Sequence, residues 1–409
     1  MTTVVHPGDS LSARQRLVYV LVLGALTALG PFTVDLYLPA FPLIEADLQT
    51  TAAVVQLTLT ATTLGFALGQ LIVGPLSDRL GRRLPLIVAT SVHLVASLGV
   101  ALAGNIELLF VFRLVQGMGA AAGAVVAMAV VRDLFGGLPL VRMLSRLALV
   151  QGLAPILAPL IGSQLLLITP WRGMFVFLAT YGALVLLAAW FFIVETLPPA
   201  RRRDLGHATA RDRYKALFTD RVFVGTAIIA GMTFSGLFAY LSSSPFLLQN
   251  VYGLDPQAFG LVFAVNSIGV VIGVQTSAFL MRYIGPQWIL AGAGIGLLLS
   301  ASAIVYLNVV NGDLFAVLVP LFLFVMFCGF SFPCTQVLAL ANHGGEAATA
   351  ASVLGAVNFG LAGLTSPIVG AFGITNAIPM GIVMGCTATV SIIVMWVVVR
   401  PRSVPALSR

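Results

Sequence analysis

The sequence predicts an all-α membrane protein whose twelve transmembrane helices form two pseudo-symmetric six-helix bundles. Three observations lead to this fold class. Hydrophobic residues make up 59% of the 409 residues, charged residues only 9%, and the mean hydropathy is +1.05, a composition that excludes a soluble globular chain. Apolar stretches of about 20 residues, the length that crosses a bilayer, recur along the chain. The two halves of the sequence also share a weak internal repeat.

Twelve apolar windows account for the predicted helices. They cover residues 17–41, 52–76, 84–104, 107–131, 144–168, 172–194, 222–248, 257–281, 287–308, 314–338, 348–371 and 377–399. The first window is too long for the core of a signal peptide, lacks an A-x-A cleavage site and leads directly into the second. We therefore expect it to remain in the mature protein. An even number of spans places both termini on the same side of the membrane.

Basic residues distinguish the two sides of the membrane. One set of loops contains Arg14, Arg16, Arg79, Arg82, Arg83, Arg132, Arg142, Arg146, the cluster from Arg201 to Arg221, Arg282 and the C-terminal arginines. The other set contains Arg172 with Glu45, Asp47, Asp255 and Asp313. The positive-inside rule therefore predicts cytoplasmic termini. Topology, and not a nucleic-acid partner, explains the net charge of +7. The excess of arginine over lysine suggests a GC-rich bacterial genome, and we expect the protein in the bacterial inner membrane.

The longest polar interval, "TLPPARRRDLGHATARDRYKALFTD", divides the chain into two halves. We expect a cytoplasmic N-terminus at 1–16, a six-helix bundle at 17–194, a cytoplasmic linker at 195–221, a second bundle at 222–399 and a cytoplasmic tail at 400–409. At an offset of 203 residues, "DLYLPAFP" in the first span aligns with "FAYLSSSP" in the seventh, so that Tyr37 matches Tyr240 and Asp35 matches Phe238. Two parallel halves with a site between them near the midplane are a transporter architecture.

Asp35 lies inside the first span, in "TVDLYLP". A carboxylate in hydrocarbon costs about 2.5–3.5 kcal/mol on insertion scales, so such residues usually face a cavity or a partner. Arg113 in the fourth span lies at a similar depth, about six residues from the outer end of its helix. The alternative is a static buried ion pair that fixes two helices. Phe238 takes the place of the acid in the repeat, which favours a functional role, because a purely architectural pair would be expected in both halves.

The loop after the second span reads "GPLSDRLGRR" and resembles the signature of the major facilitator superfamily in its characteristic position. The residues of this element and its expected partner, which we predict to form a gate, are Gly74, Asp78, Arg79, Gly81, Arg82, Arg83 and Asp133. Asp133 in "VVRDLF" is a plausible partner for Arg82, and the resemblance places Asp78 at the N-terminus of the eleventh span. The alternative is that these arginines only anchor the topology.

Two further elements narrow the resemblance. "RLVQGMGAA" in the fourth span resembles the Arg-x-x-x-Gly element of the family, with Arg113 and Gly117 one turn apart. "GLAPILAPLIG" in the fifth resembles the Gly/Pro-rich conformational element of drug-exporting antiporters, with Pro155, Pro159 and Gly162 in place and alanines and a serine at other positions. Together with "VDLYLPAFP", these elements resemble the bicyclomycin and chloramphenicol resistance (Bcr/CflA) group of drug:proton antiporters.

This resemblance implies proton-coupled export of amphipathic phenicol-, bicyclomycin- or sulfonamide-like drugs by alternating access. Desolvation favours the protonated form of a carboxyl group and a nearby cation favours the carboxylate, so we expect Asp35 to carry the proton and Arg113 to tune it. Eight residues are candidates for drug binding: Tyr37, Gln116, Gln151, Phe234, Phe238, Tyr240, Asn266 and Asn358. His93 is expected to serve packing.

Other classes of function remain open as alternatives. The first is proton-coupled import of a small metabolite, and the second is a membrane enzyme or a non-transporting assembly protein. The sequence shows no zinc-spaced His/Glu motif, no elbow serine and no Walker A loop, so enzymatic activity and ATP-driven transport are not expected. The three cysteines have no disulfide or metal-ligand spacing. The expected partners are a small-molecule drug, protons and the lipid bilayer, without a cofactor, a metal or nucleic acid, and the expected form is a monomer.

Overall fold

The structure, a computed structural model, describes residues 7–199, 210–310, 312–341 and 347–404. The first half contains η1 (Pro7–Ser10), α1 (Ala13–Asp35), η2 (Leu38–Ala40), α2 (Phe41–Asp47), α3 (Ala52–Leu80), α4 (Arg83–Ala101), α5 (Ile106–Leu134), α6 (Gly137–Leu165) and α7 (Trp171–Phe192). The second half contains α9 (Ala210–Thr219), α10 (Arg221–Phe246), η3 (Leu247–Val251), α11 (Pro256–Leu280), α12 (Pro286–Val310), α13 (Leu314–Leu340), α14 (Ala347–Ala371), α15 (Ile378–Val394), η5 (Met395–Val399) and η6 (Pro401–Ser403).

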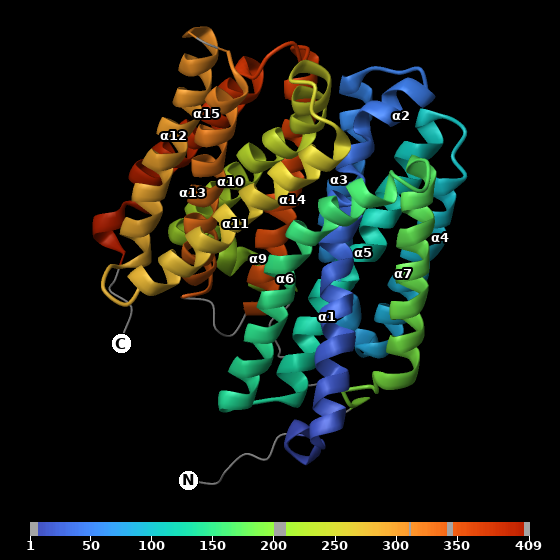
Figure 1. The fold of residues 1–409 in the computed structure, drawn as a ribbon. Coiled ribbons are helices and arrows are strands. Elements are labelled where there is room, and N and C mark those ends of the chain that lie inside the picture. Colours follow the sequence, from blue (N-terminus) through green and yellow to red (C-terminus); the bar gives the residue numbers. More distant parts are fainter. Residues whose placement is uncertain (1–6, 200–209, 311, 342–346, 405–409) are drawn as a thin grey trace.

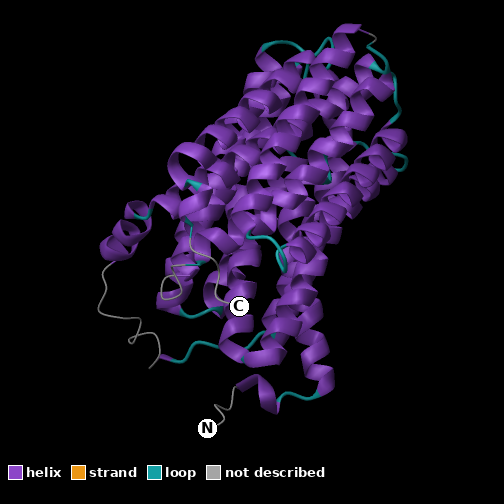
Figure 2. Cartoon of the chain, turned by 90° about the vertical axis from the view of Figure 1, so that its left-hand side faces the viewer, coloured by secondary structure: helices purple, strands orange, loops and turns teal. Residues whose placement is uncertain are grey.

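The described residues are helical throughout and include no strand. Twelve helical segments are long and apolar enough to cross a membrane, which confirms the predicted number. Figure 2 shows these helices side by side along the length of the molecule. The expected terminal segments 1–16 and 400–409 and the linker 195–221, with Arg201 to Arg203, lie partly or wholly outside the described residues.

The two halves repeat the same packing pattern. In the first half α3 and α4 each pack against α5, α4 packs against α7, and α1 packs against α6. In the second half α11 and α12 each pack against α13, α12 packs against α15, and α10 packs against α14. Each pair in the first half thus has its counterpart in the second, as the sequence repeat predicts. Across the boundary, α3 packs against α14 and α6 against α11 (Figure 1).

The start of α1 lies at the bottom of Figure 1, while α2, which follows the first span, lies at the opposite end. We call these the termini end and the far end. Near the far end the first span breaks after Asp35, where the chain turns through η2 into α2. Pro39 and Pro42 stand in the first turns of η2 and α2, where proline is tolerated because its missing N–H has no helical partner there.

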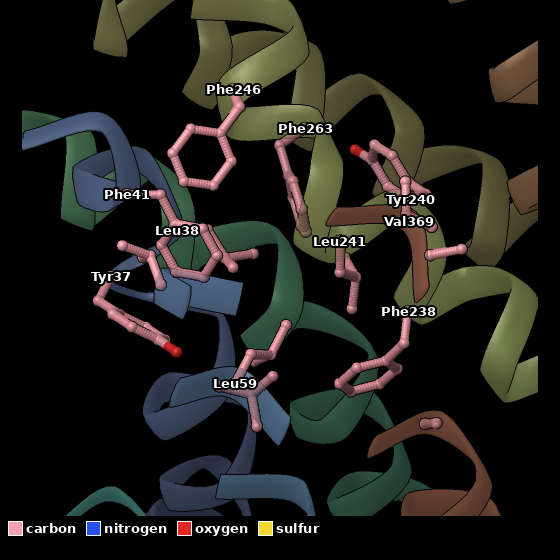
Figure 3. Close-up of a cluster of buried hydrophobic side chains, with 14 of the residues drawn as sticks. Tyr37, Leu38, Phe41, Leu59, Phe238, Tyr240, Leu241, Phe246, Phe263 and Val369 are labelled. Atoms are coloured by element: carbon pink, nitrogen blue, oxygen red, sulfur yellow. The ribbon is translucent and has the colours of Figure 1, made fainter. Parts of the chain in front are cut away.

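The largest buried cluster joins the two halves near the far end. Figure 3 shows Leu38, Phe41 and Leu59 from the first half facing Leu241 and Phe246 from the second. The Phe41 and Phe246 ring centroids are 5.7 Å apart. The halves are therefore closed against each other at this end by apolar side chains.

Glycine allows two helices of the first half to approach closely. A Cβ at Gly65 of α3 would overlap the backbone of Leu114 in α5, and a Cβ at Gly117 of α5 would overlap the backbone of Thr62 in α3. This reciprocal contact explains Gly117 in the Arg-x-x-x-Gly element by packing. It also fixes the face of α5 that carries Arg113, one turn away.

Candidate functional site

Asp35 is the last residue of α1 and is only 6% exposed. No described ion pair or hydrogen bond includes its carboxylate. The segment that follows it, η2, packs against α10 and α11 of the other half. The acid therefore lies at the boundary between the halves and has no fixed cation beside it.

Arg113 is completely buried in the first half. Its NH1 atom donates to the backbone oxygen of Thr33 at 3.0 Å and to Oε1 of Gln116 at 2.7 Å. Its guanidinium carbon lies 3.9 Å from the centre of the Tyr37 ring and 5.5 Å from that of Phe175. The structure thus places Arg113 against the residues two before and two after Asp35, without an ion pair between the two.

A buried polar network extends from Arg113 into α4. Gln116 donates through Nε2 to Oγ of Ser97 at 2.7 Å, and Ser97 donates to the backbone oxygen of His93 at 2.7 Å. Nε2 of His93 lies 2.9 Å from Oγ1 of Thr33. His93 therefore belongs to this network in addition to packing. The four-residue spacing of His93 and Ser97 on one helix face is the signal in the sequence that could have indicated it.

Two candidate drug-binding tyrosines are engaged inside their own halves. Tyr37 hydroxyl lies 3.1 Å from Oγ1 of Thr58 in α3. Tyr240 hydroxyl accepts a hydrogen bond from Nδ2 of Asn266 in α11 at 3.1 Å. Each tyrosine thus contacts the second long helix of its own half, in agreement with their alignment in the sequence repeat. Tyr37, with Gln116, faces the interior of the first half.

Five phenylalanines, which we call the phenylalanine cluster, meet where α3, α10, α13 and α14 come together. They are Phe66, Phe234, Phe238, Phe332 and Phe359. Only the two members on α10 are among the drug-binding candidates predicted from the sequence. The others occur in apolar helices, where lipid-facing phenylalanine is equally common, so their position gave no signal.

Two other drug-binding candidates, Gln151 and Asn358, are not members of the cluster, although Asn358 directly precedes Phe359. Gln151 is exposed on α6, and Asn358 on α14 is half-buried with a side-chain oxygen that has no described partner. Pro155 and Pro159 lie within a continuous α6. A Cβ at Gly162 would overlap the backbone oxygen of Leu36, so this glycine permits α6 to pack directly against the residue that follows Asp35.

The loop at the termini end forms a network inside the first half. Nε of Arg82 donates to Asp133 at 2.8 Å, as the sequence predicted, and NH1 donates to Asp78 and to Ser77. Burial lowers the pKa of Arg82, but the hydrogen bonds with Asp133 and Asp78 outweigh it and raise the pKa above its ordinary value, so the guanidinium stays charged. We call Asp78, Arg82 and Asp133 the buckle.

Neighbouring residues complete this loop. Glu195 accepts hydrogen bonds from the backbone N–H groups of Arg82 and Arg83 at 2.9 and 3.3 Å, where a carboxylate favours the start of α4. Gly81 ends α3 with φ +96°, a conformation that favours glycine. Arg79 is exposed, and Gly74 lies against Ser352 of α14. The residues just before α14, where the resemblance places the partner of Asp78, lie outside the described residues.

Three glutamines join the halves at the far end. In each, the side-chain amide donates to a backbone oxygen of the other half: Gln56 to Ser242 at 3.1 Å, Gln249 to Pro39 at 3.1 Å and Gln257 to Ser163 at 3.0 Å. These bonds carry no net charge, in contrast to the buckle. The far end is thus closed by apolar packing and by amide hydrogen bonds.

Twelve membrane-spanning helices in two repeated halves, with a buried acid at their boundary, define a membrane transporter. The family model described as Major Facilitator Superfamily matches residues 23–367, and the chain belongs to this family. It is therefore a transporter and not an enzyme. Its sequence is 34% identical over 393 residues to the uncharacterized MFS-type transporter YdgK of Bacillus subtilis. The alignment covers 96% of this chain and 98% of the relative.

Two other proteins are similar to this chain, one in sequence and one in fold. It is 27% identical over 379 residues to a bicyclomycin resistance protein homolog of Haemophilus influenzae, covering 93% of this chain and 95% of the relative. That name agrees with the resemblance seen in the sequence. The fold also matches the solved structure of a bacterial homolog to the human lysosomal transporter Spinster, in an inward-facing and unoccupied conformation, with a TM-score of 0.77, 16% identity and coverage of 97% and 100% of the two chains.

Proposed function

We propose that this transporter exports amphipathic drugs in exchange for protons by alternating access. The observation that carries the proposal is the position of Asp35, which is buried next to a segment that packs against the other half and has no described ion pair. Burial of an unpaired carboxylate in such a place costs several kcal/mol of free energy. The site is therefore stabilised when Asp35 binds a proton or accepts a hydrogen bond from a bound compound. Competition between the two at one carboxyl group is the requirement for exchange.

Arg113 contributes to this site by holding the end of α1. It bonds the backbone oxygen of Thr33 and stacks on Tyr37, so it fixes the helix turn that carries Asp35. We propose that movement of α1 relative to Arg113 changes the affinity of Asp35 for its proton during the cycle.

The closed end of the molecule indicates where the gate lies. In this structure apolar packing and glutamine bonds close the far end. We propose that the far end faces the periplasm, that the termini lie in the cytoplasm, and that Gly74, Asp78, Arg79, Gly81 to Arg83 and Asp133 form the cytoplasmic gate. The buckle lies within one half, so it moves as one unit with that half when the gate closes against the other.

Asp35→Asn tests the exchange mechanism. The amide keeps the shape and the hydrogen-bonding capacity of the site but cannot release a proton. We expect the purified variant to bind drug while losing drug-induced proton release, and cells that express it to lose resistance. Glu107→Gln is the matched control, because Glu107 is exposed at the far end. Proton release by Asp35→Asn equal to that of the wild type would contradict the proposal.

A growth-inhibition panel in an efflux-deficient bacterial host distinguishes export from import. Expression should reduce the potency of phenicol-, bicyclomycin- or sulfonamide-like compounds. An importer would leave their potency unchanged or increase it while the protein is demonstrably in the membrane.

A further inference from the structure

We propose that His93 is a positioning residue for the proton site, which stays neutral, carries its proton on Nε2 and holds the end of α1 through the hydroxyl of Thr33. This inference rests on the proposed function and adds to it a residue that acts on Asp35 through Thr33. The starting point is a buried contact between α4 and α1, in which Nε2 of His93 lies 2.9 Å from Oγ1 of Thr33. Asp35 follows Thr33 by two residues.

Thr33 belongs to a closed ring of hydrogen bonds that joins α1, α4 and α5. Arg113 donates through NH1 to the backbone oxygen of Thr33 and to the side chain of Gln116. Gln116 donates to Ser97, and Ser97 donates to the backbone oxygen of His93. The ring closes where His93 meets the hydroxyl of Thr33. All five residues are completely buried, so bulk water does not replace a bond that is lost.

The hydroxyl of Thr33 decides which nitrogen of His93 carries the proton. Its single hydrogen is donated to the backbone oxygen of Leu29 at 2.6 Å, which leaves its oxygen as an acceptor. Nε2 is then the donor in the contact with Thr33. The opposite tautomer would give up the bond to Leu29 and leave a hydrogen on Nδ1, a buried atom without a described partner. The Nε2 tautomer therefore makes two hydrogen bonds where the other makes one.

The surroundings of Nδ1 keep the imidazole neutral. This atom faces α7, where a Cβ at Gly182 would lie only 3.1 Å away. A second proton would place a charged donor there without an acceptor. It would also put a second buried cation near Arg113, because both side chains bond the same residue, Thr33. Like charges in a buried site disfavour each other, so His93 holds its neighbour without carrying a transported proton.

Thr33 and Asp35 share the last turn of α1. The first span breaks directly after Asp35, so carbonyl groups of this turn lack partners in the helix. Arg113 supplies a donor to the carbonyl of Thr33, and His93 supplies one to its hydroxyl. Two helices of the same half thus hold this turn from two sides. Loss of the bond from His93 therefore lowers the fraction of molecules in which the carboxyl group of Asp35 has this position.

The rate of proton-driven uptake of radiolabelled chloramphenicol by everted membrane vesicles tests the inference. In His93→Gln an amide N–H takes the place of Nε2–H but binds no further proton, whereas His93→Leu keeps only apolar volume. We expect His93→Leu to lower the maximal rate about 3- to 10-fold, the size of one buried hydrogen bond, and His93→Gln to retain most of the rate. The KM for chloramphenicol should change by less than about 2-fold in both, because the ring positions the proton site and not the drug.

Two further variants identify the bond itself. Thr33→Val removes the acceptor and should match His93→Leu, and the double variant should be no slower than either, because both changes remove the same bond. Thr90→Val is the matched control, since its buried hydroxyl lies on α4 as well but bonds the backbone of its own helix. It should transport as the wild type does.

Nitrogen NMR of the imidazole ring reads the position of the proton directly. The protein for this measurement keeps His93 as its single histidine, with His6, His207 and His343 replaced by glutamine. We expect the spectrum of the neutral Nε2 tautomer. A proton on Nδ1, in either the other tautomer or the charged ring, would overturn the inference.

The variants separate three roles of His93. Loss of transport by both folded His93 variants would show that His93 carries a proton, and full activity of His93→Leu would reduce it to packing, so each result overturns the inference. If His93→Leu melts at lower temperature, Thr33→Val decides, because it removes the same bond from another residue. A wild type without proton-driven uptake would instead contradict the proposed export of phenicols, while the NMR spectrum still tests the ring.

Discussion

Replacement of Arg82 by alanine should destabilise the first half of the protein. Arg82 bonds Asp133 at 2.8 Å, Ser77 at 3.1 Å and Asp78, and its side chain is 8% exposed. Removal of one partner from a buried ion pair costs about 3–5 kcal/mol because a buried charge is left behind. The side chains of Asp133 and Asp78 are 15% and 30% exposed, so water compensates in part and we expect about 2–3 kcal/mol.

Thermal unfolding in detergent, followed by tryptophan fluorescence, measures this effect. Trp190 reports on the region, because the Arg83 guanidinium lies 5.6 Å from its ring. For a unit of about 150–250 residues each kcal/mol lowers the melting temperature by roughly 2–4 °C, which gives a decrease of about 4–12 °C for Arg82→Ala. Arg82→Lys should lose less, because it keeps the charge but not the planar fork.

Arg79→Ala is the matched control from the same loop. Arg79 is exposed, and surface substitutions of this kind change stability by no more than about 0.5 kcal/mol. A wild-type melting temperature for Arg82→Ala together with impaired transport would refute the reasoning. It would mean that the important contact of Arg82 is made with the other half in another conformation, and not within the buckle.

Two further predictions concern helix packing and the far end. Gly117→Ala places a Cβ against the backbone of Thr62 and should cost about 1–3 kcal/mol, whereas Gly152→Ala, which meets nothing within 4 Å, should stabilise its helix by up to about 1 kcal/mol. Opposite shifts in melting temperature check this pair, and equal shifts would contradict it. Gln56→Leu removes the bond to Ser242, at about 0.5–1.5 kcal/mol. Spin labels across the far end should then report a larger open population than in the exposed control Gln164→Leu, and identical distance distributions would show that the glutamine bond does not hold this end closed.

The sequence by itself determined the membrane class, the number of spans, the division into two halves and the family. Hydrophobicity over 20 residues is a local property that the bilayer itself selects, so these features do not depend on how the helices pack. The pairing of Arg82 with Asp133 could also be predicted from the sequence. The two residues have opposite charges and lie at helix ends that the topology brings to the same side of the membrane. The repeat correctly paired Tyr37 with Tyr240, each of which bonds the next long helix of its half.

Only the tertiary structure decided which way the polar and aromatic side chains face. Arg113 and Asp35 lie at similar depth, yet Arg113 turns towards Tyr37 and Gln116 while Asp35 precedes the segment that packs against the other half. Helices that are apolar all round carry no stripe that fixes their rotation about their own axes. That rotation comes from contacts between distant residues, such as Gly117 against Thr62, and the same contacts bring Phe66 and Phe359 together from opposite halves of the chain.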